Sequence, residues 1–144
     1  MRFTNTVSIQ KPPPVVFGFL ARLDNLPRWN YALSRVDLVT DGPIRTGTRI
    51  RVTRTLPRPG RDELEVVDLD PARRLTLRGD LGPLHGTLDY TLEGAPGGAT
   101  LLRNTADVSP RGLARLLSPL LVNGVRSAVA ANLDVMRQLV ETEQ

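Results

Sequence analysis

The sequence predicts a single α+β domain in which a curved antiparallel sheet of about seven strands surrounds one long C-terminal helix. Three observations support this fold class. The 144 residues are enough for one hydrophobic core and too few for two domains, so residues 1–144 form one unit. Between residues 34 and 108, apolar and polar residues alternate, and turn residues separate the runs, as in an antiparallel meander. Beyond that segment, apolar residues recur at the spacing of a helix.

The N-terminal part is predicted to form one strand and two short helices. Residues 3–10 have their apolar side chains on one parity, which indicates a half-buried strand. The prolines at 12–14 end this strand because proline has no N–H to donate, and proline is also tolerated in the first turn of a helix. A helix is therefore expected over 15–23 and a second short one over 24–29, with Trp29 packing it onto the core.

Six further strands follow from the alternating pattern. The third of them has two conflicting registers. Asp68 shares a parity with Leu64 and Val66, whereas Val67 and Leu69 favour the opposite face, so the side on which Asp68 lies is left open. The expected strands lie around 36–38 and over 48–56, 63–69, 74–81, 86–93 and 100–108.

The last third of the chain is predicted to be helical. Ser109 is expected as an N-cap with Pro110 at the first helical position. The Ser118–Pro119 dipeptide is expected to kink this stretch or to end an initial short helix. The main helix is predicted over 119–141, a length of about 34 Å. Its apolar stripe consists of Val122, Val125, Val129, Leu133, Met136 and Val140.

Composition excludes several kinds of site. The chain has no cysteine, which excludes disulfides, thiolate metal sites and cysteine nucleophiles, and its single histidine, His85, cannot form a histidine pair. No apolar run approaches the roughly 20 residues of a membrane span, and the first residues lack the apolar stretch of a signal peptide. We therefore expect a cytoplasmic protein, a monomer or a homodimer, with no integral membrane association, no metal and no organic cofactor.

The charge pattern does not favour nucleic acid as a partner. The net charge is +4, but the nineteen basic residues are interspersed with acidic ones and only 4% of the residues are aromatic. One alternative stays open, in which the basic surface binds an acidic protein, a membrane or a nucleic acid. A salt titration would detect it, since such binding weakens steeply with ionic strength.

Small residues occur among the inward-facing aliphatic residues. A strongly twisted sheet around one long helix leaves a space that small side chains need not fill. This pattern allows either an apolar cavity or a packed core. The small residues in question are Gly79, Gly86, Ala106, Gly124 and Ala128.

Five segments along the chain carry a family resemblance. They are 11–17 after the first strand, 23–29 in the short helices, 47–48, 70–75 between strands, and 97–100 before the sixth of the later strands. Together they resemble the START-like (SRPBCC) helix-grip superfamily, and within it the polyketide cyclase/dehydrase group, over essentially the whole chain. The resemblance implies a helix-grip fold whose cavity binds lipids or other hydrophobic or polycyclic molecules. In a minority of members the cavity catalyses cyclisation, dehydration or hydrolysis.

Parity on the strands and spacing on the helix place four polar residues on or beside the inward faces. An inward Arg54 requires an internal carboxylate or an anionic or carbonyl-bearing ligand, unless it lies at the sheet edge with its head in water. Tyr90 is either a core residue with a satisfied hydroxyl or a hydrogen-bond donor to a ligand. Asn104 lies mid-strand, where an inward amide must find a partner, and Asn132 flanks the apolar stripe of the helix.

Two functions are compatible with these residues. The first is binding of a hydrophobic or polycyclic small molecule between the sheet and the helix. The alternative is a cofactor-independent polyketide cyclase/dehydratase, in which Arg54 and Tyr90 are the candidate catalytic residues. Trp29 is open to a purely structural interpretation, and His85 is expected in a solvated turn. The residues expected to contact the ligand are Trp29, Val52, Arg54, Leu77, Leu88, Tyr90, Asn104, Val125, Val129, Asn132 and Met136.

Overall fold

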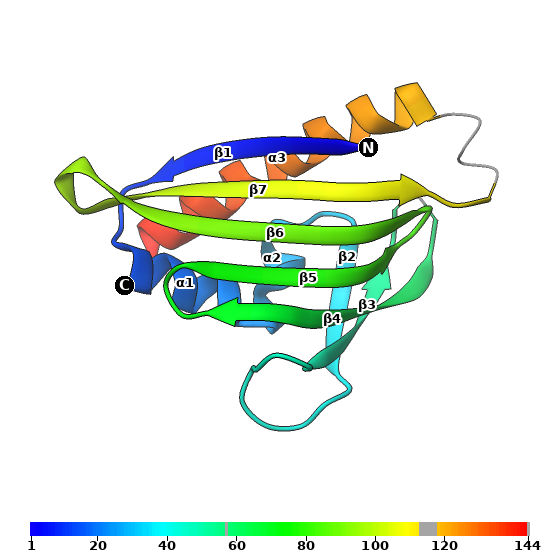
Figure 1. The fold of residues 1–144 in the computed structure, drawn as a ribbon, viewed down its shortest axis with the longest axis horizontal. Helices are drawn as coiled ribbons and strands as arrows, with labels where there is room; N and C mark the ends of the chain where they lie inside the picture. Colours follow the sequence, from blue (N-terminus) through cyan, green and yellow to red (C-terminus); the bar gives the residue numbers. More distant parts are fainter. Residues whose placement is uncertain (57, 113–117, 144) are drawn as a thin grey trace.

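The protein is built on one curved antiparallel sheet, seen here in a computed structural model that describes residues 1–56, 58–112 and 118–143. Six of the strands form a meander in chain order, and β1 pairs with β7 at the end of it. Figure 1 shows β2 and β3 turned steeply away from the other strands, with the helices on one side of the sheet. In spatial order the seven strands are β1 (Arg2–Ile9), β7 (Ala99–Pro110), β6 (Leu84–Ala95), β5 (Arg74–Leu81), β4 (Gly60–Asp70), β3 (Arg49–Arg54) and β2 (Leu33–Leu38).

The helices after β1 and the long C-terminal helix lie close to where the sequence predicts them. After β1, Pro12 caps α1 (Pro13–Ala21) by accepting hydrogen bonds from the N–H groups of Val15 and Val16 with its carbonyl oxygen. The short helices η1 (Leu23–Asn25) and α2 (Leu26–Trp29) follow directly. A third short helix, η2 (Pro96–Gly98), makes the turn between β6 and β7. The long helix α3 (Ser118–Thr142) crosses the concave side of the sheet and packs on β1.

Two predictions about turns and helix starts are wrong. Ser109 and Pro110 do not begin a helix, because the β6–β7 ladder continues as far as the Leu84–Pro110 pair. The alternation that keeps Val108 buried and Ser109 exposed extends to the end of this strand. His85 does not lie in a turn but is the second residue of β6. Ser118 is the first residue of α3, and the expected short helix or kink before it falls on residues 113–117, outside the described residues.

The two conflicting registers of β4 are both right, each on its own side of a bulge. Pairing with β5 shifts between Val66 and Asp68. Before the shift Leu64 and Val66 face the core, and after it Leu69 packs against the core. Asp68 therefore faces outward, where its Oδ2 lies 3.5 Å from Nε of Arg74.

The core has a large part and a small part. The large part gathers around α1, α2 and the C-terminal end of α3, where Leu133, Met136 and Val140 are buried. Toward the other end of the sheet a small cluster contains Phe3, Leu84, Ala106 and Val108, with the half-buried Val125 and Val129 of α3 against it.

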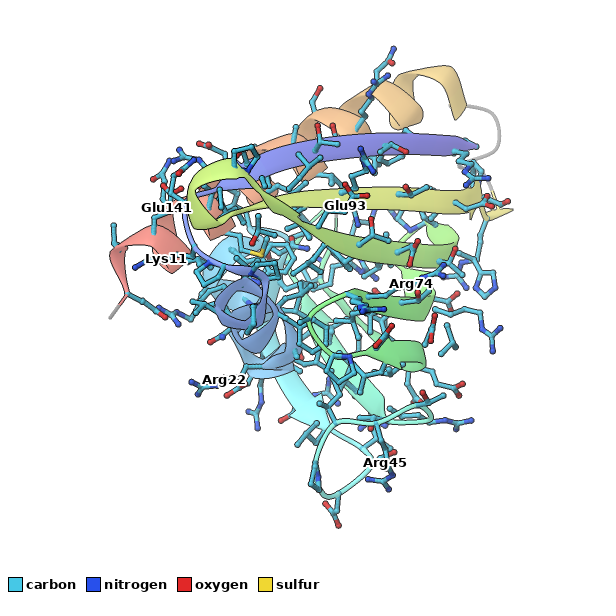
Figure 2. All side chains as sticks on the ribbon, turned by 60° about the vertical axis from the view of Figure 1, so that its left-hand side comes forward. Lys11, Arg22, Arg45, Arg74, Glu93 and Glu141 are labelled. Carbon is cyan, nitrogen blue, oxygen red and sulfur yellow. The ribbon has the colours of Figure 1, made fainter. Side chains whose placement is uncertain are left out.

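Most charged side chains of the described residues lie on the outside, and the pair of Arg54 and Asp62 is an exception. Arg22 and Arg45 extend away from the ribbon at the periphery (Figure 2). Among the described helices, none is both long and apolar enough to cross a membrane.

Candidate functional site: a cavity under the C-terminal helix

A cavity of about 530 Å³ lies between the concave face of the sheet and α3. Its volume falls within the range of small-molecule sites, roughly 300–1,000 Å³. Its walls come from all seven strands, from the end of α2 and the segment after it, and from α3. Apolar side chains dominate these walls: Phe3, Trp29, Leu33, Leu56, Leu64, Leu81, Leu84, Leu88, Val108, Val125 and Val129.

Two glycines allow the sheet to bend around this space. Gly79 of β5 and Gly86 of β6 pair directly across the ladder, and both have positive φ angles, 152° and 154°. A Cβ at Gly79 would lie 2.2 Å from the carbonyl oxygen of Glu63, and one at Gly86 would lie 2.1 Å from that of Asp107. Neighbouring backbone can approach this closely only where there is no side chain. The same two glycines also leave the cavity wall without side chains.

The cavity reaches the surface beside the segment that follows α2. Tyr31 and Leu56 line the cavity, yet they are 67% and 55% exposed. On α3, Ala128 and Ala131 also line it and are exposed. These four residues define the mouth, through which an apolar molecule could enter without crossing the packed core.

Trp29 and Tyr90 form an aromatic pair on the wall. Their rings meet edge to face, with centroids 6.3 Å apart and an interplanar angle of 89°. Within the described part of the chain no group forms a hydrogen bond with the Tyr90 hydroxyl. Burial raises the pKa of Tyr90 well above its ordinary value. The hydroxyl therefore stays protonated at neutral pH and can donate to a molecule in the cavity.

Asn104 is a second wall residue whose polar atoms lack partners among the described residues. It lies directly opposite Tyr90 in the β6–β7 ladder and is completely buried. Neither its Nδ2 nor its Oδ1 has a hydrogen-bond partner among the described residues. An unsatisfied buried polar group costs about 1–3 kcal/mol, so both atoms favour a partner that enters the cavity.

Two further polar side chains lie on the wall but already have partners. Asn132 of α3 accepts a hydrogen bond at Oδ1 from the Tyr31 N–H, 3.5 Å away, which joins the helix to the segment at the mouth. Arg54 lies with its Nε 2.8 Å from Oδ2 of Asp62, and their side chains are only 15% and 5% exposed. The Gly82 N–H donates to the same oxygen at 2.9 Å. The arginine charge is thus neutralised within the protein.

A comparison with known protein families identifies the family of this chain. The profile of the family described as polyketide cyclase/dehydrase and lipid transport matches residues 1–141. The chain belongs to this family. No curated protein sequence matches it. The resemblance seen in the sequence and the predicted helix-grip fold are both confirmed.

Solved structures with low sequence identity share the fold of this polyketide cyclase/dehydrase family member. The Zhui aromatase/cyclase from Streptomyces sp. R1128 superposes with a TM-score of 0.83 at 17% identity, over 98% of this chain and 93% of that one. TTHA0849 from Thermus thermophilus gives 0.77 at 17% identity, over 97% of each chain. The di-domain ARO/CYC BexL from the BE-7585A biosynthetic pathway gives 0.73 at 19% identity, over 99% of this chain and 48% of that one.

In this family member most of the residues expected to contact a ligand line the cavity. Val52, Leu77 and Met136 do not line it. They are at most 2% exposed and are packed in the large part of the core, where the neighbouring side chains are bulky. The expected residues on the wall are Trp29, Arg54, Leu88, Tyr90, Asn104, Val125, Val129 and Asn132.

Sequence reasoning missed the partner of Arg54 and did not include Tyr31 or Leu56 among the ligand contacts. Leu56 falls within the strand expected over 48–56, but β3 ends at Arg54 and Leu56 lies beyond it. Tyr31 lies in an irregular segment after α2, where no period predicts which way a side chain points. Asp62 had a usable signal, since it shares a parity with the inward Leu64 on the strand that follows Arg54. The five small residues noted in the sequence all line the cavity.

His85 lies outside the cavity. Its side chain is 58% exposed, and its Nδ1 lies 2.6 Å from Oδ1 of Asp80. Leu84 and Gly86, its neighbours in β6, line the cavity, so His85 points to the other face of the sheet. It cannot reach a molecule bound under α3.

Proposed function

We propose that the protein binds a hydrophobic or polycyclic small molecule in the cavity under α3. The observation that carries this proposal is the cavity of about 530 Å³ with nearly continuous apolar walls and a mouth at Tyr31 and Leu56. Apolar surface that leaves water on entering such a space supplies most of the binding free energy. The few polar groups on the wall would orient the molecule.

A cavity-filling substitution tests this proposal. Val129→Trp would place an indole inside the cavity from α3 and is expected to weaken binding of Prodan, a fluorescent naphthalene probe, by about tenfold or more. Ala128→Phe, at the exposed rim, serves the same purpose if the first variant does not fold. The matched control is Val39→Trp, since Val39 is an exposed apolar residue that does not line the cavity. Equal Prodan affinity in the folded filling variants and the control would contradict the proposal.

Native mass spectrometry gives an independent measurement. The freshly purified protein is weighed under native conditions, and any bound molecule is extracted and identified. A stoichiometric apolar molecule in the wild type that is missing from Val129→Trp would support the cavity as its site. The same molecule retained in both proteins would place it elsewhere.

A second candidate function is cyclisation and dehydration of a poly-keto chain, favoured by two polar wall residues. Tyr90 and Arg54 line the same cavity, and Tyr90 is a neutral donor at physiological pH. In an intramolecular aldol step, a carbon next to one carbonyl loses a proton and bonds to the carbon of another. The second carbonyl oxygen gains a proton, and loss of water then leaves a double bond. A donor such as Tyr90 would stabilise the negative charge on that oxygen.

Variants that lose turnover but still bind the substrate would distinguish the enzyme from a protein that only binds a ligand. Tyr90→Phe is expected to lower turnover of a poly-β-keto substrate by about 100-fold or more and to weaken its binding much less. The corresponding test of Arg54 is the double variant Arg54→Ala, Asp62→Ala, which avoids leaving one charge buried without its partner. Unchanged turnover in both variants would argue against the catalytic role of these residues.

A further inference from the structure

Asn104 carries a free donor and a free acceptor at one point of the cavity wall. Its amide is completely buried, and neither polar atom has a protein partner among the residues that the structure describes. Other buried polar side chains are treated differently. Thr100 donates to the Lys11 carbonyl oxygen at 2.7 Å, and Asn25 donates to that of Phe19 at 3.1 Å.

The strand neighbours of Asn104 do not supply the missing hydrogen bonds. In the ladder Asn104 lies between Asn5 of β1 and Tyr90 of β6, and all three side chains share one face of the sheet. Asn5 donates its Nδ2 to the Arg126 carbonyl oxygen of α3, 3.4 Å away. Leu102 and Ala106, the next residues of β7 on this face, are apolar. None of these neighbours pairs with the amide, and the cavity that Asn104 lines is where a partner can enter.

We infer that Asn104 binds the polar end of the ligand, and that this end presents a hydrogen-bond acceptor and a hydrogen-bond donor side by side. A carboxamide has this arrangement, and so does a carbonyl with an adjacent enol O–H. The Nδ2 group donates to the ligand carbonyl oxygen, and Oδ1 accepts from the ligand N–H or O–H. The Tyr90 hydroxyl, opposite in the ladder, provides a second donor to the same carbonyl oxygen. This inference rests on the proposed function and names the ligand chemistry that the cavity selects.

Asn104 makes the cavity selective for a ligand with complementary polar groups. Leucine has nearly the shape of asparagine and would leave no unpaired polar atom in this wall. A buried polar group discriminates strongly because a ligand without a partner for it leaves it unsatisfied. A mostly apolar ligand whose polar end pairs with both polar atoms of Asn104 is bound in one orientation. An analogue without that polar end binds less well.

Three naphthalene probes of nearly equal shape test the inference. 2-Isopropylnaphthalene has no polar group, 2-acetylnaphthalene has the acceptor alone, and 2-naphthamide has acceptor and donor together. Wild-type protein is expected to bind 2-naphthamide at least as tightly as 2-isopropylnaphthalene, although the amide loses more hydration on entering an apolar cavity. In Asn104→Leu the affinity for 2-naphthamide should fall about tenfold or more, and that for 2-isopropylnaphthalene should stay within about twofold.

The matched control is Asn5→Leu, the same substitution one strand away and outside the cavity wall. It should leave the ratio of the two affinities unchanged. The melting temperature of Asn104→Leu should not fall, whereas replacing an asparagine with a purely structural role would lower it. Wild-type protein gives a readout that needs no variant. The side-chain amide resonances of Asn104 should shift on addition of 2-naphthamide and not of 2-isopropylnaphthalene.

The outcomes separate the two proposals. If the probes bind and the affinity ratio is the same in wild type and Asn104→Leu, the role of Asn104 is wrong and the cavity proposal stands. If Asn104→Leu does not fold, unshifted Asn104 amide resonances with bound 2-naphthamide overturn the inference. If none of the three probes binds to the wild type, the cavity proposal and this inference are both overturned.

Discussion

The concave face of the sheet has a filled half and an open half, and the same strands contribute to both. In β5, Leu75 is completely buried in the core, whereas Gly79, four residues further on the same face, borders the cavity. In β6, Leu92 is buried in the core and Gly86 borders the cavity. Strand order and hydrogen-bond register continue through both halves. Side-chain volume, not topology, therefore decides where the cavity lies.

The two halves also differ in how their buried polar side chains are paired. In the filled half, Asn25 and Thr100 are buried and each has a hydrogen-bond partner. In the open half, Asn104 has none among the described residues. Hydrogen bonds in the filled half serve the fold, and the unpaired amide in the open half is available to a ligand.

The largest expected effect concerns the glycine that bends the sheet at the open half. Gly86→Ala would bring a Cβ to 2.1 Å from the Asp107 carbonyl oxygen, at a positive φ that alanine disfavours. We expect a loss of about 4 kcal/mol or more in the free energy of unfolding, measured by urea denaturation. Gly94→Ala in the same strand is the control, because a Cβ added there would have no neighbouring atom within 4 Å. Equal stability of the two variants would mean that the sheet does not depend on the close approach at Gly86.

The next largest effect is a difference in the loss of stability when a leucine is shortened in each half. Leu102 is completely buried in the filled half, so Leu102→Ala should cost about 3 kcal/mol by creating a new void. Leu88 is half-buried on the wall of an existing cavity, so Leu88→Ala should cost only about 1 kcal/mol. Urea denaturation of both variants measures the difference. A reversed order would show that the region under α3 is packed as tightly as the rest.

The smallest effect is the pH dependence caused by Tyr90. Burial raises its pKa in the folded protein, whereas a tyrosine in the unfolded chain ionises near pH 10. Above about pH 10 the unfolded state therefore binds fewer protons, and stability falls by up to about 1.4 kcal/mol per pH unit. Below that pH the contribution is fully present. The free energies of unfolding at pH 9 and 11 should fall more in wild type than in Tyr90→Phe, and equal slopes would contradict a buried, protonated Tyr90.

Much of the fold could be predicted from the sequence because burial imposes periods of two and 3.6 residues. The predicted strand over 74–81 matches β5, and the predicted helix over 119–141 lies within α3. The bulge in β4 could not be predicted, because each half of that strand shows a valid alternation and only the pairing with β5 joins them. The Ser109–Pro110 signal failed because the alternation of β7 continues through it.

The site was predictable on the regular elements and not at the mouth. Parity placed Tyr90 and Asn104 on the inward face, and both line the cavity. Parity could not distinguish Leu88, which lines the cavity, from Leu77, its partner across the β5–β6 ladder, which does not. That distinction depends on the volume of side chains from several strands. Tyr31 lies in an irregular segment whose position depends on tertiary contacts.

Methyl NMR of the wild type with 2-isopropylnaphthalene tests most directly whether the open half binds ligands. Shifts are expected for methyl groups on the cavity wall, at Leu88, Val108 and Val129. The methyl groups of Leu75 and Leu102 in the filled half should not shift, since no probe can reach them. No shifts at saturating probe, or shifts in the filled half without those on the wall, would contradict a ligand cavity under α3.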